Sequence, residues 1–546
     1  MRSNIQDFKG QIFLIAIITI IIIPIITVFS YLMTPSTEIW SHLFNTLLLE
    51  YLNNTLIILL CVGFAATAIG LISAWVVTMY DFPGKRVFKW LLVLPIALPT
   101  YIAAYIYAGL IEPTGLFFDF FEYFFNSGAL IYKSIDVRNI GGVIFILSIC
   151  LYPYIYLLCY SSFSEQSSCA LEVGKSLGLN KKELFKKVSL PLARPGIIAG
   201  LSLVLMETLA EFATMEYYGV STFTTGIYRT WFFLEDEASA LHLASILLTF
   251  VFIVIILENY TRGKSKYFHT SQKIKYIKAE KITGAKSTYA FMWCLIICML
   301  GIIIPVLQIL FWLIDTYSYM LNFYFTTIIF NTIFLASLGA LLIVAISMYS
   351  SYIKRSTNNI VTRLSIKIYS LGYSIPGVVI AMGIILLLTM VDNIQTLLFD
   401  EPIYFLSGSL IGLLIAYLVR FSTISYNATE SGLLKIKKNI DLTVKSFGYS
   451  TFMTLKNIHL PMMKFSIMTA FILVFVDIVK ELPATLILRP FNFDTLAIHI
   501  YELAEAEQLS NIATPALMLI IISMIPVIIL INNTINKKDA DTETRN

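Results

Sequence analysis

A short polar stretch between two long apolar runs contains Leu171-Glu172-Val173-Gly174, then Gly178, and then Val188-Ser189-Leu190-Pro191. The same spacing returns 270 residues later, with Gly448 and with Ile458-His459-Leu460-Pro461. The register continues into the next apolar run, where Glu207 and Glu211 correspond to Asp477 and Glu481. The chain therefore contains two copies of one unit, each with a polar loop followed by an apolar segment that carries two acids.

The composition places this duplicated unit in a membrane. Of 546 residues, 58% are hydrophobic and only 13% are charged, and the mean hydropathy is +0.80. Soluble domains carry about 25% charged residues. Because a helix needs about 20 apolar residues to cross a bilayer, the sequence predicts an all-α protein with about twelve spans, six in each half. We expect them at 11–33, 54–80, 88–111, 141–163, 195–215, 241–258, 289–314, 330–353, 368–391, 404–426, 464–480 and 511–532.

Lys and Arg concentrate in alternate loops, and this distribution predicts the topology. By the positive-inside rule, both polar loops and both termini lie on the cytoplasmic side of the membrane. We expect a first membrane domain at 1–258 with a cytoplasmic loop at 164–194, a basic cytoplasmic linker at 259–288, and a second domain at 289–546 with a loop at 430–463. The two halves are then parallel repeats with a pathway between them.

The two loops have the features of rigid helical knobs. Gly178 suits the left-handed position just past a helix end, and Asn180 with Glu183 forms a capping-box pattern for a second helix. We expect Pro191 to end that helix. His459 lies inside the second copy and is expected to be an interface residue. An amphipathic surface helix is the alternative for one such loop, but two matched copies favour docking sites for a separate motor.

The loops resemble the EAA signature of ABC importer permeases, which is Glu-Ala-Ala, three residues, Gly, nine residues, Ile-x-Leu-Pro. The first loop departs from it at Val173-Gly174 and Val188, and the second has Leu442-Thr443-Val444 in place of Glu-Ala-Ala. The resemblance implies the type I permease architecture in a bacterial inner membrane, with loops that dock on an ATPase. The coupling residues that it implies are Glu172, Gly178, Val188, Leu190, Pro191, Gly448, Ile458, Leu460 and Pro461.

Longer stretches are similar to the fused permeases of ferric iron importers, among them Met206–Phe212, Thr222–Trp231 and Lys480–Phe491. The resemblance implies import of ferric iron that an outer binding protein delivers and a homodimeric ATP-binding subunit powers. Permeases for thiamine, aminophosphonate or polyamine share the layout and remain alternatives. An ion-coupled carrier is a different class, and it has no use for paired docking knobs.

Four acids are the candidate pathway residues. Glu207 and Glu211 share a helix face, as do their counterparts Asp477 and Glu481, and ionisable residues inside a span mark functional sites by default. Fe³⁺ prefers oxygen ligands, although the sequence assigns no firm metal site. Structural ion pairs with Lys480, Arg420 or Arg489 are the alternative.

The chain itself carries no sign of an enzyme. It has no Gly-x-x-x-x-Gly-Lys-Ser/Thr loop for ATP and no catalytic constellation. We expect no ATPase activity and no bound cofactor, with ATP used by the partner subunit. The expected partners are that subunit, the outer binding protein and membrane lipid, and no nucleic acid.

Overall fold

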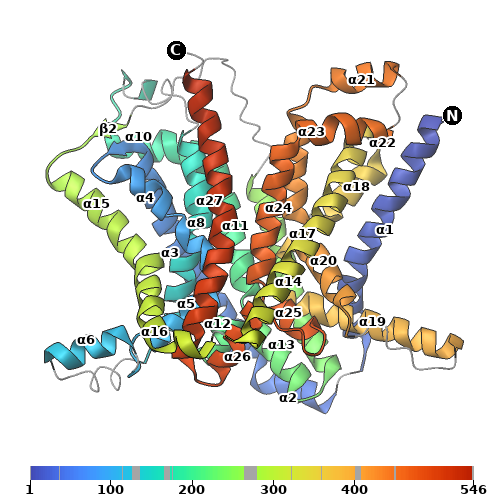
Figure 1. Cartoon of the computed structure of the whole chain (residues 1–546), viewed down its shortest axis with the longest axis horizontal. Coiled ribbons are helices and arrows are strands. Elements are labelled where there is room, and N and C mark those ends of the chain that lie inside the picture. The colour runs from blue at the N-terminus through green and yellow to red at the C-terminus, as the bar shows by residue number, and fades with distance from the viewer. Residues whose placement is uncertain are drawn as a thin grey trace.

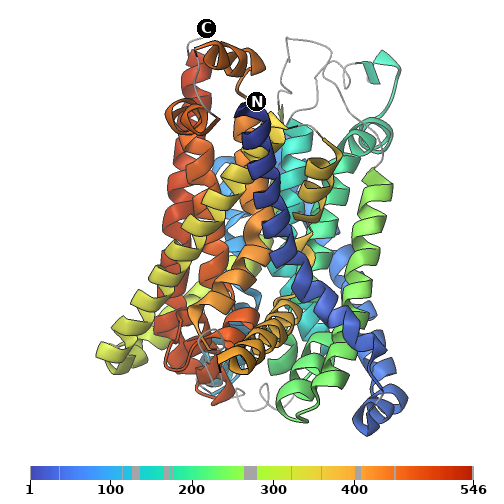
Figure 2. The same ribbon diagram turned by 90° about the vertical axis from the view of Figure 1, so that its right-hand side faces the viewer.

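The computed structural model describes residues 2–543 apart from 36, 114, 126–135, 165–172, 175, 263–278, 321, 358, 370, 400–407 and 448–450. Its described part has ten helices that are long and apolar enough to cross a membrane, or up to twelve if two sharply bent pairs are each counted as one span. The prediction of an all-helical chain with about twelve spans is confirmed. The two coupling-loop regions and both chain ends lie at one end of the bundle (Figures 1 and 2).

The first half runs through α1 (Arg2–Ser30), η1 (Tyr31–Met33), α2 (Glu38–Thr46), α3 (Leu48–Met79), β1 (Tyr80–Asp81), α4 (Lys85–Leu91), η2 (Leu94–Ala97), α5 (Thr100–Gly109), α6 (Leu116–Phe125), α8 (Ile140–Ser164), α10 (Lys181–Leu184), η3 (Phe185–Ser189), α11 (Leu190–Ala210), α12 (Ala213–Tyr217), α13 (Phe223–Phe232) and α14 (Glu237–Arg262).

The second half runs through β2 (Glu280–Lys281), α15 (Ala285–Cys298), η4 (Met299–Ile303), α16 (Ile304–Met320), α17 (Phe323–Ser356), α18 (Ile360–Tyr369), η5 (Gly372–Ser374), α19 (Gly377–Phe399), α20 (Leu410–Leu434), α21 (Lys438–Ser446), α22 (Thr451–Thr454), η6 (Leu455–His459), α23 (Leu460–Met462), α24 (Lys464–Lys480), α25 (Pro483–Leu488), α26 (Leu496–Glu505), η7 (Leu509–Ile512) and α27 (Ala513–Glu543).

The same three-helix packing recurs in both halves. Helix α8 packs on α3 and α11, and its counterpart α20 packs on α17 and α24. The first helix of each half reaches across to the other half. Helix α1 packs on α18 and α19, while α15 and α16 pack on α4 and α5. The halves are therefore interlocked rather than merely adjacent.

Two prolines at equivalent positions break the helices that lead into the centre. The expected span 88–111 is a bent pair, Lys85–Ala97 and Thr100–Gly109, with 94° between its parts. Leu98 before Pro99 is extended (ψ 114°), as is Ile375 before Pro376 (ψ 128°). The ring of proline disfavours helical geometry in the preceding residue, so each half gains a helix start, at Thr100 and at Gly377.

The expectation that Pro191 ends the loop helix is wrong. Residues Lys182–Ala210 form one continuous helix, in which a π-turn at Phe185–Ser189 leads directly into α11. The wider π-turn accommodates the proline ring and its missing N–H. In the second half a π-turn stands at the matching place, Leu455–His459, but the helix then bends by 74° between Met462 and Lys464.

The described ends of the linker are tied to the first half. Tyr80 and Asp81 pair in parallel with Glu280 and Lys281. The chain thus enters the second half beside the turn that follows α3.

Candidate functional site

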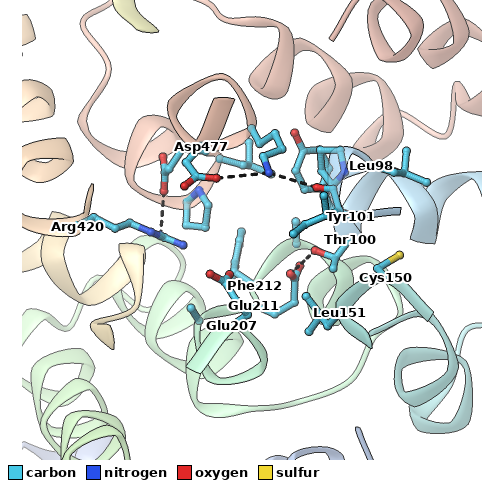
Figure 3. A pocket seen from close by; sticks show the side chains of 18 of the residues that line it. Leu98, Thr100, Tyr101, Cys150, Leu151, Glu207, Glu211, Phe212, Arg420 and Asp477 are labelled. Atoms are coloured by element: carbon cyan, nitrogen blue, oxygen red, sulfur yellow. Dashed lines mark hydrogen bonds and ion pairs between the residues drawn. The ribbon is translucent and has the colours of Figure 1, made fainter. Parts of the chain in front are cut away.

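All four candidate acids line one cavity of about 120 Å³ between the two halves (Figure 3). Glu207 and Glu211 come from the end of α11, and Asp477 and Glu481 from the end of α24. Thr100 at the start of α5, Cys150 of α8 and Arg420 of α20 also contribute to the wall. The duplication therefore brings the acids of both copies to the same place.

Local backbone geometry explains why the last acid of each pair faces inward. Helices α11 and α24 end at Glu211 and Glu481, whose backbones are extended (ψ 131° and 123°). Each carboxylate then caps the next short helix. Glu211 accepts a hydrogen bond from the Thr214 amide (3.0 Å), and Glu481 accepts from the amides of Ala484 (3.0 Å) and Thr485 (2.9 Å). A helix N-terminus stabilises negative charge.

The acids of the second half are neutralised by ion pairs. Arg420 Nη1 lies 3.1 Å from Glu481 Oε1, with side chains 12% and 1% exposed. Lys480 Nζ lies 3.4 Å from Asp477 Oδ1. Arg489, the third cation considered, binds Asp494 and Glu502 instead. For Asp477 and Glu481 the structure therefore shows the ion pairs that were the alternative to a pathway role.

The acids of the first half have neutral partners. The Tyr373 hydroxyl donates to Glu207 Oε1 (2.6 Å), and the Thr100 hydroxyl donates to Glu211 Oε2. Within the described part of the chain, the ion pairs at this cavity involve only Asp477 and Glu481. The cavity therefore carries an excess of negative charge on its first-half side.

Two substitutions between the repeats produce this asymmetry. The counterpart of Thr100 is Gly377, where an added Cβ would lie 2.3 Å from Arg420 Nη1 and 2.8 Å from Glu481 Oε1. The counterpart of Arg420 is Cys150, which also lines the cavity. Glycine at 377 thus makes room for the guanidinium that pairs with Glu481. Alignment of the two repeats could have revealed this exchange, which the sequence reasoning missed.

Aromatic and ionic contacts join the halves beside the cavity. The Phe212 ring, which lines the cavity, lies 4.7 Å from the Tyr228 ring and 6.3 Å from the Tyr501 ring. Further along, Arg138 binds Glu112 (2.8 Å) and Glu507 (3.2 Å), which belong to different halves. The helices that carry Tyr228 and Tyr501, α13 and α26, lie at the end opposite the coupling loops (Figure 1).

The first coupling loop has the predicted turn chemistry. Gly178 adopts a left-handed conformation (φ +79°), which confirms the expectation from the sequence. The backbone N–H of Asn180 donates to Glu183 Oε2 (3.1 Å), and the backbone N–H of Glu183 donates to Asn180 Oδ1 (2.9 Å). The capping box is therefore also confirmed. Val188 lies in the π-turn, and Leu190 and Pro191 begin α11. Glu172 falls outside the described residues.

In the second loop, Ile458 lies in the π-turn and Leu460 with Pro461 forms α23, while Gly448 falls outside the described residues. A network around the buried His459 holds this loop. His459 Nε2 lies 2.8 Å from Asp441 Oδ1, and Arg355 Nε lies 2.7 Å from Asp441 Oδ2. The His459 side chain is 0% exposed, so the expectation that it is an interface residue is wrong.

A comparison with known families identifies the chain. The model for "Binding-protein-dependent transport system inner membrane component" matches residues 66–261 and 342–537, once in each half. The chain belongs to this family. It is a multi-pass inner-membrane permease of the ABC importer type, as the loops predicted.

Individual relatives are consistent with the family. The Fe(3+)-transport system permease protein FbpB 2 of Haemophilus influenzae is 24% identical over 531 residues, which cover 96% of this chain and 98% of that protein. The ferric transport system permease protein FbpB of Actinobacillus pleuropneumoniae is 22% identical over 81% of this chain and 65% of its own length. The sulfate transport system permease protein CysT of Salmonella typhimurium is 30% identical over 27% of this chain and 50% of its own.

Among solved structures, a chain of a bacterial alginate ABC transporter aligns with a TM-score of 0.38 and 16% identity, covering 45% of this permease and 91% of that chain.

Proposed function

We propose that this permease conducts ferric iron, delivered by a binding protein at its outer face, into the cytoplasm. The energy comes from a separate homodimeric ATPase that docks on the two coupling loops. The observation that carries the cargo assignment is the cavity between the halves, where Glu207 and Glu211 present carboxylates that no cation neutralises in the described part of the chain. Full-length similarity to ferric permeases supports the same cargo.

The charge of the cavity favours cationic cargoes over anionic ones. Carboxylate oxygens are ligands that a hard cation prefers, whereas an anion such as sulfate or a phosphonate would be repelled. Within the described residues no three His, Cys, Asp or Glu side chains gather closely enough to hold a metal ion. A site that attracts a cation without chelating it suits passage better than storage. Thiamine and polyamines are also cations, so they are the cargoes that the experiment must separate from iron.

A continuous helix connects the first coupling loop to the cavity and can act as a rigid lever. The continuous helix Lys182–Ala210 begins beside the capping box and carries Glu207 near its far end. At 1.5 Å per residue, Glu183 and Glu207 are roughly 36 Å apart along the axis. The second loop meets its cavity helix through the 74° bend. We infer that the first loop transmits displacement directly and that the second acts as a pivot, so the two loops do not couple equally.

The proposed orientation places both termini and both loops in the cytoplasm. The basic loops support it through the positive-inside rule, and the joint position of the termini and the loop helices at one end of the bundle agrees with it (Figure 1).

The decisive experiment is reconstitution in proteoliposomes with the ATPase and the binding protein. We expect uptake of radioactive Fe³⁺ that requires ATP, and no ATP hydrolysis by the permease alone. Uptake without the ATPase, driven by a proton gradient, would show an ion-coupled carrier. ATP-dependent uptake of thiamine or a polyamine in place of iron would reassign the cargo.

A further inference from the structure

Helix α6 (Leu116–Phe125) carries an unusual concentration of aromatic side chains on an exposed surface. Its sequence is LFFDFFEYFF, with seven aromatic residues in ten and no Lys or Arg. Tyr123 is 85% exposed, and Phe124 and Phe125 are each 64% exposed. Soluble surfaces rarely expose apolar patches of this density, so this helix requires a partner.

The aromatic residues are not distributed evenly around the helix. Phe117, Phe120 and Phe124 follow the spacing that places side chains on one face. Asp119 and Glu122 fall on the other side of the helix at 100° per residue. Helix α6 is therefore amphipathic, with an aromatic face and an acidic face.

The direction of α6 is set by the turn that precedes it. A Cβ at Gly115 would lie 2.2 Å from the Gly109 carbonyl oxygen, so only glycine fits there. The amides of Phe117 and Phe118 donate to the Leu110 carbonyl, and the Leu116 amide donates to the buried side chain of Gln308 (2.9 Å). Helix α6 thus leaves the bundle sideways as a supported arm at the end opposite the coupling loops (Figure 1).

The second half has a matching arm. The offset of 277 residues that relates Pro99 to Pro376 places α6 opposite the last turns of α19. That segment exposes Met390, Ile394, Leu397 and Leu398 and projects to the other side of the bundle at the same level as α6 (Figure 1). The arms are the same element of the repeat, broken by a turn in the first half and continuous in the second.

The surface of α6 continues a lipid-facing surface. The first residue of α6 is hydrogen-bonded to α16. Helix α16 belongs to the candidate span Ala285–Thr316 and exposes Leu307, Leu310 and Ile314. A binding protein that delivers cargo to the cavity must approach the centre of the outer face, whereas α6 points away from it (Figure 1). Continuity with the spans and direction both favour lipid as the occupant.

We propose that α6 lies in the outer interface of the bilayer, with the Phe117–Phe120–Phe124 face among the acyl chains next to the headgroups and the acidic face in water. Amphipathic helices with Phe or Leu on one face bind at this depth by burying that face, and Tyr123 is of a residue type that favours the interface. Because the arm has no basic residue, its insertion does not need anionic lipid. It holds the outer edge of the first half at a fixed depth in the membrane.

The test compares Phe124→Cys with Glu122→Cys, two exposed positions on opposite faces of α6. Each variant is spin-labelled in the permease–ATPase complex in phosphatidylcholine vesicles, and labelling of the unsubstituted protein is subtracted. We expect collisions of the label with oxygen to dominate at 124 and collisions with a water-soluble nickel complex to dominate at 122. Retained transport shows that both variants are folded.

Three results would overturn the proposal. Equal nickel accessibility at both positions would place the aromatic face in water. Immobilisation of the label at 124 only after the binding protein is added would make α6 a protein-docking surface. Oxygen dominance at 124 only when phosphatidylglycerol is present would mean that anionic headgroups hold the arm.

Discussion

Glu211 and Glu481 occupy equivalent positions in the two halves, so their amide variants form a matched pair. Both carboxylates cap a short helix, but Glu211 accepts from the Thr100 hydroxyl and Glu481 binds Arg420. We predict that Glu481→Gln lowers the amount of folded permease in the membrane, whereas Glu211→Gln leaves the amount unchanged and lowers iron uptake.

The magnitude follows from what each amide can replace. At 211 the amide oxygen can accept from Thr214 while the amide nitrogen donates to Thr100, so both hydrogen bonds survive. At 481 one oxygen accepts from Ala484 and Arg420, and the other accepts from the Thr485 amide and hydroxyl (2.9 and 2.6 Å). An amide nitrogen there cannot accept from the Thr485 amide, and Arg420 loses its counter-charge. Breaking a buried pair costs about 3–5 kcal/mol, or roughly two to four powers of ten in the folding equilibrium.

The assay measures uptake of radioactive iron and membrane abundance in the same cells. The control is the double variant Arg420→Met with Glu481→Gln. It removes both charges, and a neutral replacement of a buried pair is far less harmful than removal of one partner, so abundance should recover. Normal abundance with low uptake in Glu481→Gln would refute a purely structural role for Glu481. Low abundance in Glu211→Gln would refute the pathway role of Glu211.

Further predictions concern the other acids and the loops. Glu207→Gln should reduce uptake at normal abundance, because the Tyr373 hydroxyl can donate to an amide oxygen as well as to a carboxylate; normal uptake would remove Glu207 from the pathway. Gly178→Val with Gly448→Val should uncouple ATP hydrolysis from uptake. The left-handed backbone of Gly178 costs a side-chain-bearing residue about 1–2 kcal/mol, and Gly448 is its counterpart in the sequence of the second loop. Gly178→Asn serves as the tolerated control, and wild-type transport in the valine pair would exclude the loops from coupling. Asp441→Asn should lower the free energy of unfolding by roughly 3 kcal/mol, because it removes the counter-charge of Arg355, whose side chain is 10% exposed. Glu507→Gln, at the exposed end of the pair with Arg138, should cost under about 1 kcal/mol. Equal losses would contradict the burial argument. Burial opposes the charge of Asp236, but hydrogen bonds from Ser239 and Thr37 hold its pKa below the usual range. The stabilisation by its carboxylate is therefore present above about pH 4 and is lost as the pH falls through the folded pKa. Asp236→Asn should flatten that part of the stability–pH curve, and an unchanged curve would argue against this role of Asp236.

Local chemistry could be predicted from the sequence where neighbouring residues decide the outcome. The left-handed Gly178 and the Asn180–Glu183 box depend on a few adjacent residues, and both are as expected. The spans follow from apolar length alone. The gathering of four acids followed from the duplication, because a common register carries both pairs to equivalent helix ends.

Predictions failed or were incomplete where distant segments decide the outcome. Pro191 does not end its helix, because the π-turn that precedes it changes the pattern of backbone hydrogen bonds. A proline at position 191 does not by itself reveal that π-turn. The partner of Glu481 comes from α20, 61 residues earlier in the chain. The burial of His459 depends on Asp441 and Arg355, which belong to other helices.

The differences between the halves point to a division of labour. The first half has the continuous helix from its loop to the cavity, and its two acids have no ionic partner within the described residues. The second half has the bent connection, the Arg420–Glu481 pair and the Arg355–Asp441–His459 network. Ion pairs suit a part of the permease that keeps its shape. Acids with neutral partners, at the end of a continuous helix, suit a part of the permease that moves with its cargo. A fused chain can maintain this asymmetry, because each half of one polypeptide evolves its own residues, whereas two identical subunits would have to share them.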